Sequence, residues 1–162
     1  MKEKSLPPRF AEIANGEIKW ARVDGIDFDL LGYFLCIHLT IEHYLDQFLK
    51  IVHPDLDWDA SRQTFGQKIS LMTKFKTPPN YDVVPAIKHL NSLRNRISHT
   101  LEIEITPDSL LPLAQCLRKA FNDEREIPSE PKDLLERFTD LVCAFFAGYI
   151  SAHLRRSKTK KA

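Results

Sequence analysis

The clearest pattern in the chain lies in residues 27–52, where apolar side chains recur every three or four positions. That spacing puts them on one face of an α-helix, which turns once in about 3.6 residues. Pro54 follows, and proline cannot continue a helix. We therefore predict a long first helix whose inward face contains Leu31, Phe34, Ile41, Leu45, Phe48 and Val52.

Three further segments show helical spacing, at residues 64–75, 85–101 and 108–121. The run Pro78-Pro79-Asn80 separates the first from the second, and Thr106-Pro107-Asp108 is an N-terminal signal for the third. The expected inward residues of the first two segments are Phe65, Ile69, Met72 and Phe75, then Val84, Ile87, Leu90, Ile97 and Leu101.

A last helix is predicted over residues 132–156, after a polar break around Pro128 and Pro131. Its apolar residues cover about half of the helix circumference, which is more than a one-sided surface helix needs. We expect this helix either to be central or to contact a partner. Its apolar residues are Leu134, Leu135, Phe138, Leu141, Val142, Phe145, Phe146, Tyr149 and Ile150.

These segments predict an all-α fold, a bundle of four main helices and one shorter helix. Residues 1–26 are expected to form an N-terminal arm, residues 27–156 the bundle, and residues 157–162 a basic tail. A faint alternation at Ile18, Trp20 and Arg22 favours a short hairpin within the arm. The basic run that begins at Arg155 fits either a solvated tail or a segment that attracts a polyanion.

Composition narrows the class of protein. With 162 residues, 43% hydrophobic and 28% charged, the chain fits one globular domain, and its net charge of +1 gives no overall basic field. Cys36, Cys116 and Cys143 lie far apart in apolar runs, so we expect them to pack as small apolar residues rather than bind metal. No stretch approaches the roughly 20 apolar residues of a membrane span. We expect a cytoplasmic protein without membrane contact.

One charged residue needs an explanation. Arg94 falls within the apolar arc of its predicted helix, and an unpaired buried charge is costly. His38 and Glu42, four residues apart on the first helix, share a face with apolar residues. We therefore expect a contact between Glu42 and Arg94. It fits either a structural salt bridge or support for a functional site, and His38 fits either a core histidine or a supporting residue of that site. A polar strip borders the same arc, formed by Asn91, Asn95, Ser98 and His99.

The segment Arg94-Asn95-Arg96-Ile97-Ser98-His99 resembles the Arg-Asn-x-x-x-His motif of HEPN domains. These are small all-α bundles, many of them RNA-cleaving toxins or antiviral nucleases. The resemblance covers about residues 28–154 and includes a long first helix with an inward acidic residue, here Glu42.

The resemblance implies a metal-independent endoribonuclease with no cofactor, in which two protomers bring their motifs together at a homodimer interface. Histidine suits proton transfer near neutral pH, and the arginine fork suits phosphate oxygens. RNA is then the expected substrate, and an antitoxin protein is a possible partner. The expected roles are catalysis by Arg94, Asn95 and His99, support by Glu42, His38 and Ser98, and substrate binding by Arg96 and Asn91.

Two other hypotheses remain. In the first, the chain is a non-catalytic HEPN-like module for dimerisation or nucleotide binding, and the Arg/Asn/His cluster only locks helices together. In the second, it is an unrelated helical adaptor that binds a peptide. Geometry discriminates between them, because a lock requires Arg94 and His99 to be enclosed and mutually satisfied, whereas a nuclease requires them to line a solvent-open cleft shared by two chains.

Overall fold

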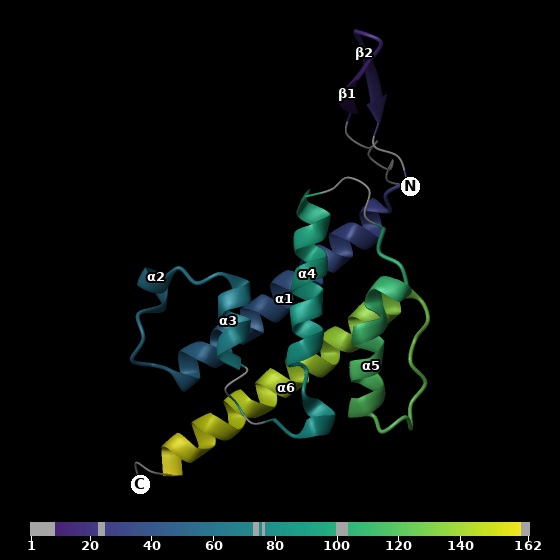
Figure 1. The fold of residues 1–162 in the computed structure, drawn as a ribbon. Helices are drawn as coiled ribbons and strands as arrows, with labels where there is room; N and C mark the ends of the chain where they lie inside the picture. Colours follow the sequence, from purple (N-terminus) through teal and green to yellow (C-terminus); the bar gives the residue numbers. More distant parts are fainter. Residues whose placement is uncertain (1–8, 23–24, 73–74, 76, 100–103, 160–162) are drawn as a thin grey trace, which may run out of the picture.

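The computed structural model describes residues 9–22, 25–72, 75, 77–99 and 104–159 (Figure 1). These residues are mostly helical, as expected for the all-α class, and they include one two-stranded hairpin. Each of the five predicted segments contains a helix, and the four-residue α2 was not predicted. The elements are β1 (Arg9–Ala14), β2 (Glu17–Arg22), α1 (Phe28–Val52), α2 (Trp58–Ser61), α3 (Phe65–Met72), η1 (Pro79–Tyr81), α4 (Val84–His99), η2 (Asp108–Leu110), α5 (Leu111–Ala120) and α6 (Pro131–Thr159).

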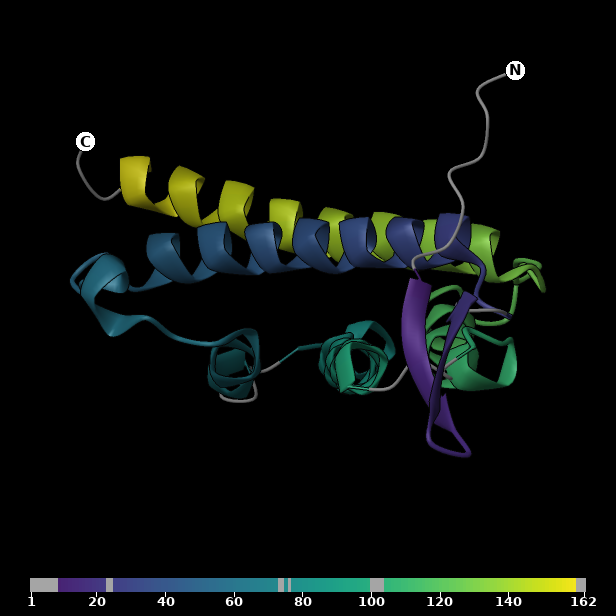
Figure 2. The same cartoon turned by 90° about the horizontal axis from the view of Figure 1, so that it is seen from above.

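The helices form two layers. In Figure 2, α1 and α6 run across the view side by side, whereas α3, α4 and α5 are seen nearly end-on in a row below them. The core lies between the layers, and its fully buried side chains come from both. The wide apolar face of α6 packs only in part against this core, because Leu141, Phe145, Tyr149 and Ile150 are half-buried. Its fully buried members are Leu135, Phe138, Val142 and Phe146.

Local sequence signals explain most helix ends. The carboxylate of Asp27 accepts a hydrogen bond from the Leu30 amide at 2.9 Å and caps α1. Thr64 and Gln67 form a capping box at the start of α3, with the Thr64 amide 2.8 Å from the Gln67 Oε1 atom. The helix α4 ends at His99, and the expected inward position of Leu101 lies outside the described residues.

The predicted basic tail needs a correction at its start. We ended the last helix at Arg156, but α6 continues through Thr159, so the first three residues of the predicted tail are helical. No residue between Pro131 and Thr159 is a proline, and the residues after Arg156 do not interrupt helical geometry.

The hairpin predicted in the arm is present and its turn is at Asn15-Gly16. The strands are antiparallel, and the pairing of Ala14 with Glu17 leaves a two-residue loop. Both loop residues have positive φ, 54° and 81°, as a tight hairpin turn requires. The hairpin projects from the helical layers (Figure 1), and the side chains of Ile13, Ile18 and Trp20 are exposed.

The cysteines behave less uniformly than we predicted. All three are free thiols. Burial raises the pKa of the Cys116 thiol to about 11, so that this residue packs as a neutral apolar side chain. Cys143 is half-buried, but Cys36 is exposed, because it lies on the outer face of α1 beside the exposed Leu35. Within the described part of the chain, no helix has the length and apolar character needed to cross a membrane.

Candidate functional site

A polar pocket of about 450 Å³ opens where α1, the start of α3 and the middle of α4 meet. Five of the eight predicted site residues line it, which brings together side chains more than 50 positions apart in the sequence. The lining residues are His38, Glu42, Thr64, Phe65, Gly66, Asn91, Arg94 and Asn95. We call this cavity the polar pocket.

His38 lies at the buried end of the polar pocket, where it joins α1 to α4. Its Nε2 atom is 3.4 Å from the Oδ1 atom of Asn91, and its ring meets the Phe65 ring edge-on with 4.5 Å between centroids. Burial lowers the pKa of His38 below its ordinary value, and this effect outweighs the hydrogen bond to Asn91 and the attraction of Glu42. The imidazole is therefore neutral at pH 7 and donates to the Asn91 oxygen.

Glu42 is paired with a residue that we did not predict. Its carboxylate lies 3.6 Å from the ammonium of Lys68 on α3, and the same ammonium lies 3.1 Å from Asp46. Asp46 also contacts Lys50 at 2.9 Å. Burial by itself raises the pKa of Asp46, but the hydrogen bonds from Lys50 and Lys68 outweigh burial and lower it. An alternating row of two acids and two lysines therefore ties α1 to α3.

The expected contact between Glu42 and Arg94 is wrong, because in the described residues no ion pair joins them. Arg94 is exposed at the rim of the polar pocket and does not point into the core. The reason is that Leu93 is fully buried together with Leu90. The inward face of α4 is therefore centred on the side of Leu90 and Leu93, away from Arg94. The polar contact that Arg94 makes is with its neighbour, where Nη1 lies 3.4 Å from the Asn95 Oδ1 atom.

His99, Ser98 and Arg96 do not line the polar pocket. All three are exposed in the last turns of α4. The hydroxyl of Ser98 donates to the Asn95 carbonyl oxygen at 2.8 Å, a bond within the same helix that gives no support to the His99 ring. Arg94 and His99 are five residues apart, so they point in directions that differ by about 140° and lie about 7.5 Å apart along the helix axis.

Sequence reasoning missed three contributors from the start of α3. Lys68 neutralises the acids of α1, Phe65 covers the His38 ring, and Gly66 lines the pocket beside Asn91, where a Cβ atom would lie 3.6 Å from the Asn91 Nδ2 atom. The acids Glu42 and Asp46, four residues apart on one helix face, were a usable signal that a cation had to lie opposite them. Nothing in the sequence pattern indicated which of the chain's lysines or arginines that cation was.

The described site residues offer groups for anion binding and for proton transfer. A guanidinium lies at the pocket rim, where no carboxylate of the described residues pairs with it, and the exposed end of α4 carries an imidazole. Among the described residues, no group of three or more histidine, cysteine, aspartate or glutamate side chains is arranged to hold a metal ion.

Comparisons with protein-family models, with curated proteins and with solved structures found no match for this chain.

Proposed function

We propose that the protein is a HEPN-type, metal-independent endoribonuclease whose active site forms between two copies of the chain. One observation carries the proposal: Arg94, Asn95 and His99 lie on the exposed end of a single helix, and in the described residues no carboxylate neutralises Arg94. An arginine held at a pocket rim with donors directed to solvent is suited to a phosphodiester.

The proposed roles follow from residue chemistry. The Arg94 guanidinium binds non-bridging phosphate oxygens and stabilises the charge that develops on them. One His99 takes the proton of the ribose 2′-hydroxyl as its oxygen attacks phosphorus, and a second imidazole donates a proton to the leaving 5′-oxygen. Asn95, which contacts Arg94, orients that guanidinium. Arg96 supplies an exposed cation for the RNA backbone.

The need for two protomers follows from the helix geometry. Because Arg94 and His99 diverge by about 140° around α4, one copy does not direct both side chains at the same phosphate. Two copies related by a two-fold axis near the end of α4 place the Arg94 of one chain beside the His99 of the other and supply two imidazoles. Toxin or antiviral activity, with an antitoxin protein as partner, belongs to the same proposal.

The alternative, a non-catalytic module, requires the cluster to act as a lock between helices. A polar lock between α1 and α4 exists, but His38 and Asn91 form it. Neither Arg94 nor His99 makes a hydrogen bond or ion pair to another helix within the described ranges. This arrangement favours the catalytic proposal over the lock.

The test uses purified full-length protein, structured and unstructured RNA substrates, and excess EDTA. We expect cleavage by the wild type, with products that carry a cyclic phosphate and a 5′-hydroxyl. Arg94→Ala and His99→Ala should each lower the rate by at least about a hundredfold. Arg118→Ala and His43→Ala are matched controls, since both residues are exposed elsewhere and should leave the rate unchanged.

A mixing experiment tests the composite site. An equimolar mixture of Arg94→Ala and His99→Ala protein should regain only part of the activity. A mixed dimer places one intact Arg94 beside one intact His99, which acts as the base, while water in place of the second imidazole donates the proton to the leaving 5′-oxygen. The proposal is contradicted if the wild-type protein cleaves none of the substrates, or if the wild type and both variants cleave them at equal rates.

A further inference from the structure

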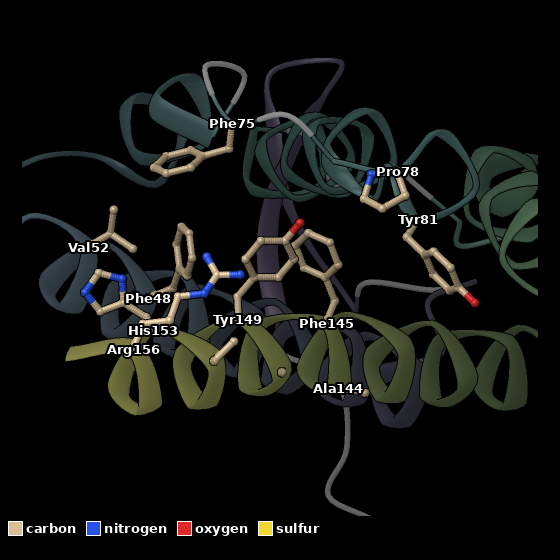
Figure 3. A pocket seen from close by; sticks show the side chains of 12 residues that line it. Phe48, Val52, Phe75, Pro78, Tyr81, Ala144, Phe145, Tyr149, His153 and Arg156 are labelled. Carbon is tan, nitrogen blue, oxygen red and sulfur yellow. The ribbon is translucent and has the colours of Figure 1, made fainter. Parts of the chain in front are cut away.

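A second cavity, apolar and separate from the polar pocket, lies between the C-terminal halves of α1 and α6. Its volume is about 630 Å³, and Figure 3 shows aromatic side chains around it from three parts of the chain. We call it the aromatic cavity. Its lining residues are Phe48, Val52, Phe75, Pro78, Tyr81, Ala144, Phe145, Gly148, Tyr149, Ala152, His153 and Arg156.

The aromatic wall is held in place by contacts between rings. The Phe48 ring is 5.3 Å from the Phe75 ring and 6.1 Å from the Tyr149 ring, and Tyr149 lies 4.9 Å from Phe145. Such ring pairs stabilise each other beyond simple burial, so the wall needs little rearrangement to receive a ligand. The volume lies within the roughly 300–1,000 Å³ of small-molecule sites.

The cavity exists because one stripe of α6 has little or no side chain. Ala144, Gly148 and Ala152 follow one another at intervals of four residues and line the cavity beside the aromatic rings. A Cβ atom built at Gly148 meets no other atom within 4 Å. The space at this position is therefore large enough for a side chain, although the sequence places glycine there.

Charge at one end selects the kind of ligand. His153 and Arg156 line the C-terminal end of the cavity, and Figure 3 shows both side chains on this side. None of the twelve described lining residues is acidic, and in the described part of the chain no carboxylate pairs with Arg156. An aromatic wall alone also suits a cationic ligand, but an arginine at its edge repels a cation and attracts an anion.

We propose that the aromatic cavity binds a small amphipathic anion, a molecule with an apolar body and one terminal carboxylate or phosphate. The body lies against Phe48, Phe145 and Tyr149, and the anionic group is held by Arg156, whose planar donors match carboxylate and phosphate oxygens. The site is independent of the proposed nuclease activity, since it shares no residue with the polar pocket.

The test is isothermal titration calorimetry of the full chain with dodecanoate and dodecyl phosphate, kept below their micelle-forming concentrations. Dodecyltrimethylammonium is the matched cation. We expect one anion per chain and binding at least about tenfold tighter than that of the cation. Equal affinity for anion and cation, no binding of either anion, or binding only to phosphatidylglycerol vesicles would overturn the proposal.

Three variants locate the ligand. Gly148→Leu fills the cavity and should abolish binding while helical circular dichroism is retained, and Ala152→Leu is a second filling variant on the same stripe. Arg156→Gln should weaken the anions about tenfold and leave the cation unchanged, whereas Arg118→Gln on α5 should change neither. Unaltered anion binding in both filling variants would overturn the assignment of the ligand to this cavity. The assignment would also be overturned if the chain self-associates and a second copy covers the cavity and excludes the anions.

Discussion

The Nε2 atom of His38 on α1 lies 3.4 Å from the Oδ1 atom of Asn91 on α4, and this contact fixes the two helices at the buried end of the polar pocket. His38 is 5% exposed, so water has little access to its ring nitrogen and does not readily replace Asn91. Leaving a buried donor without a partner costs more free energy than the hydrogen bond itself contributes. The position of Arg94, about one turn further along α4, therefore depends on the contact between His38 and Asn91.

Asn91→Ala removes the acceptor of His38 and should lower the free energy of unfolding by about 1–2 kcal/mol. The measurement is urea unfolding followed by circular dichroism. Asn95→Ala is the matched control, because Asn95 is on the same helix but exposed, and its substitution should change the free energy by less than about 0.5 kcal/mol. Equal effects of the two substitutions would show that the contact with His38 does not stabilise the fold.

The depressed pKa of His38 predicts loss of stability in mild acid. The unfolded chain binds a proton near the ordinary value of 6.5, whereas the folded chain, with burial opposing the charge, binds it only at lower pH. The unfolding free energy should be constant above 6.5, fall as the pH drops below it, and level off once the folded pKa is passed. His38→Gln should reduce this slope, and His43→Gln should not. Urea midpoints measured every half pH unit provide the comparison.

Lys68→Ala leaves the carboxylates of Glu42 and Asp46 without their shared cation, and should lower the unfolding free energy by about 1 kcal/mol. Because salt screens such pairs, the difference from wild type should shrink in 1 M sodium chloride. Lys88→Ala on the exposed side of α4 is the control and should have no measurable effect. If the loss of unfolding free energy in Lys68→Ala persists at high salt, it comes from the packing of the lysine stem and not from the ion pairs.

Leu45→Ala and Leu39→Ala make the same change on the same helix with different burial. Leu45 is fully buried in the core, and its truncation should lower the free energy of unfolding by about 2–5 kcal/mol. Leu39 is 64% exposed, and its truncation should cost less than about 0.5 kcal/mol. Unfolding free energies of the two variants test which face of α1 lies inward, and similar values would contradict the packing of this helix.

Gly16→Val puts a β-branched residue where φ is 81° and should open the hairpin. Since the hairpin side chains are mostly exposed, the helical layers should keep their unfolding free energy to within about 0.5 kcal/mol. Nuclear Overhauser contacts between Ala11 and Trp20, which are cross-strand partners, should vanish. A larger loss of helix stability would show that the hairpin supports the layers.

Helix positions were predictable because each has a local cause. The apolar spacing of α1, the carboxylate at Asp27 and the proline at 54 all lie in the segment they define. The Asn15-Gly16 turn was equally local, and the dipeptide is the strongest short hairpin signal. The hairpin was predicted from the faint alternation that follows this dipeptide, and the dipeptide itself was not used.

The candidate site was predictable only in part, because it depends on how far each helix is rotated. The arc we drew on α4 omitted Leu93, and including it moves the centre of the buried face away from Arg94. The rotation of α4 about its own axis decides whether an arginine lies in the core or at a pocket rim, and spacing within one helix does not determine that rotation. The partner of Glu42 comes from α3, a helix whose place beside α1 no local pattern specifies.

The pairing of α1 with α6 has a consequence for how the chain is made. A ribosome completes α1 about 80 residues before it begins α6. The apolar face of α1 therefore lacks its main packing partner while every helix between the two is synthesised. Contacts of such high sequence separation form slowly, since a long loop has to close first. During that interval the nascent chain exposes Phe34, Ile41 and Leu45 to any chaperone that binds apolar segments.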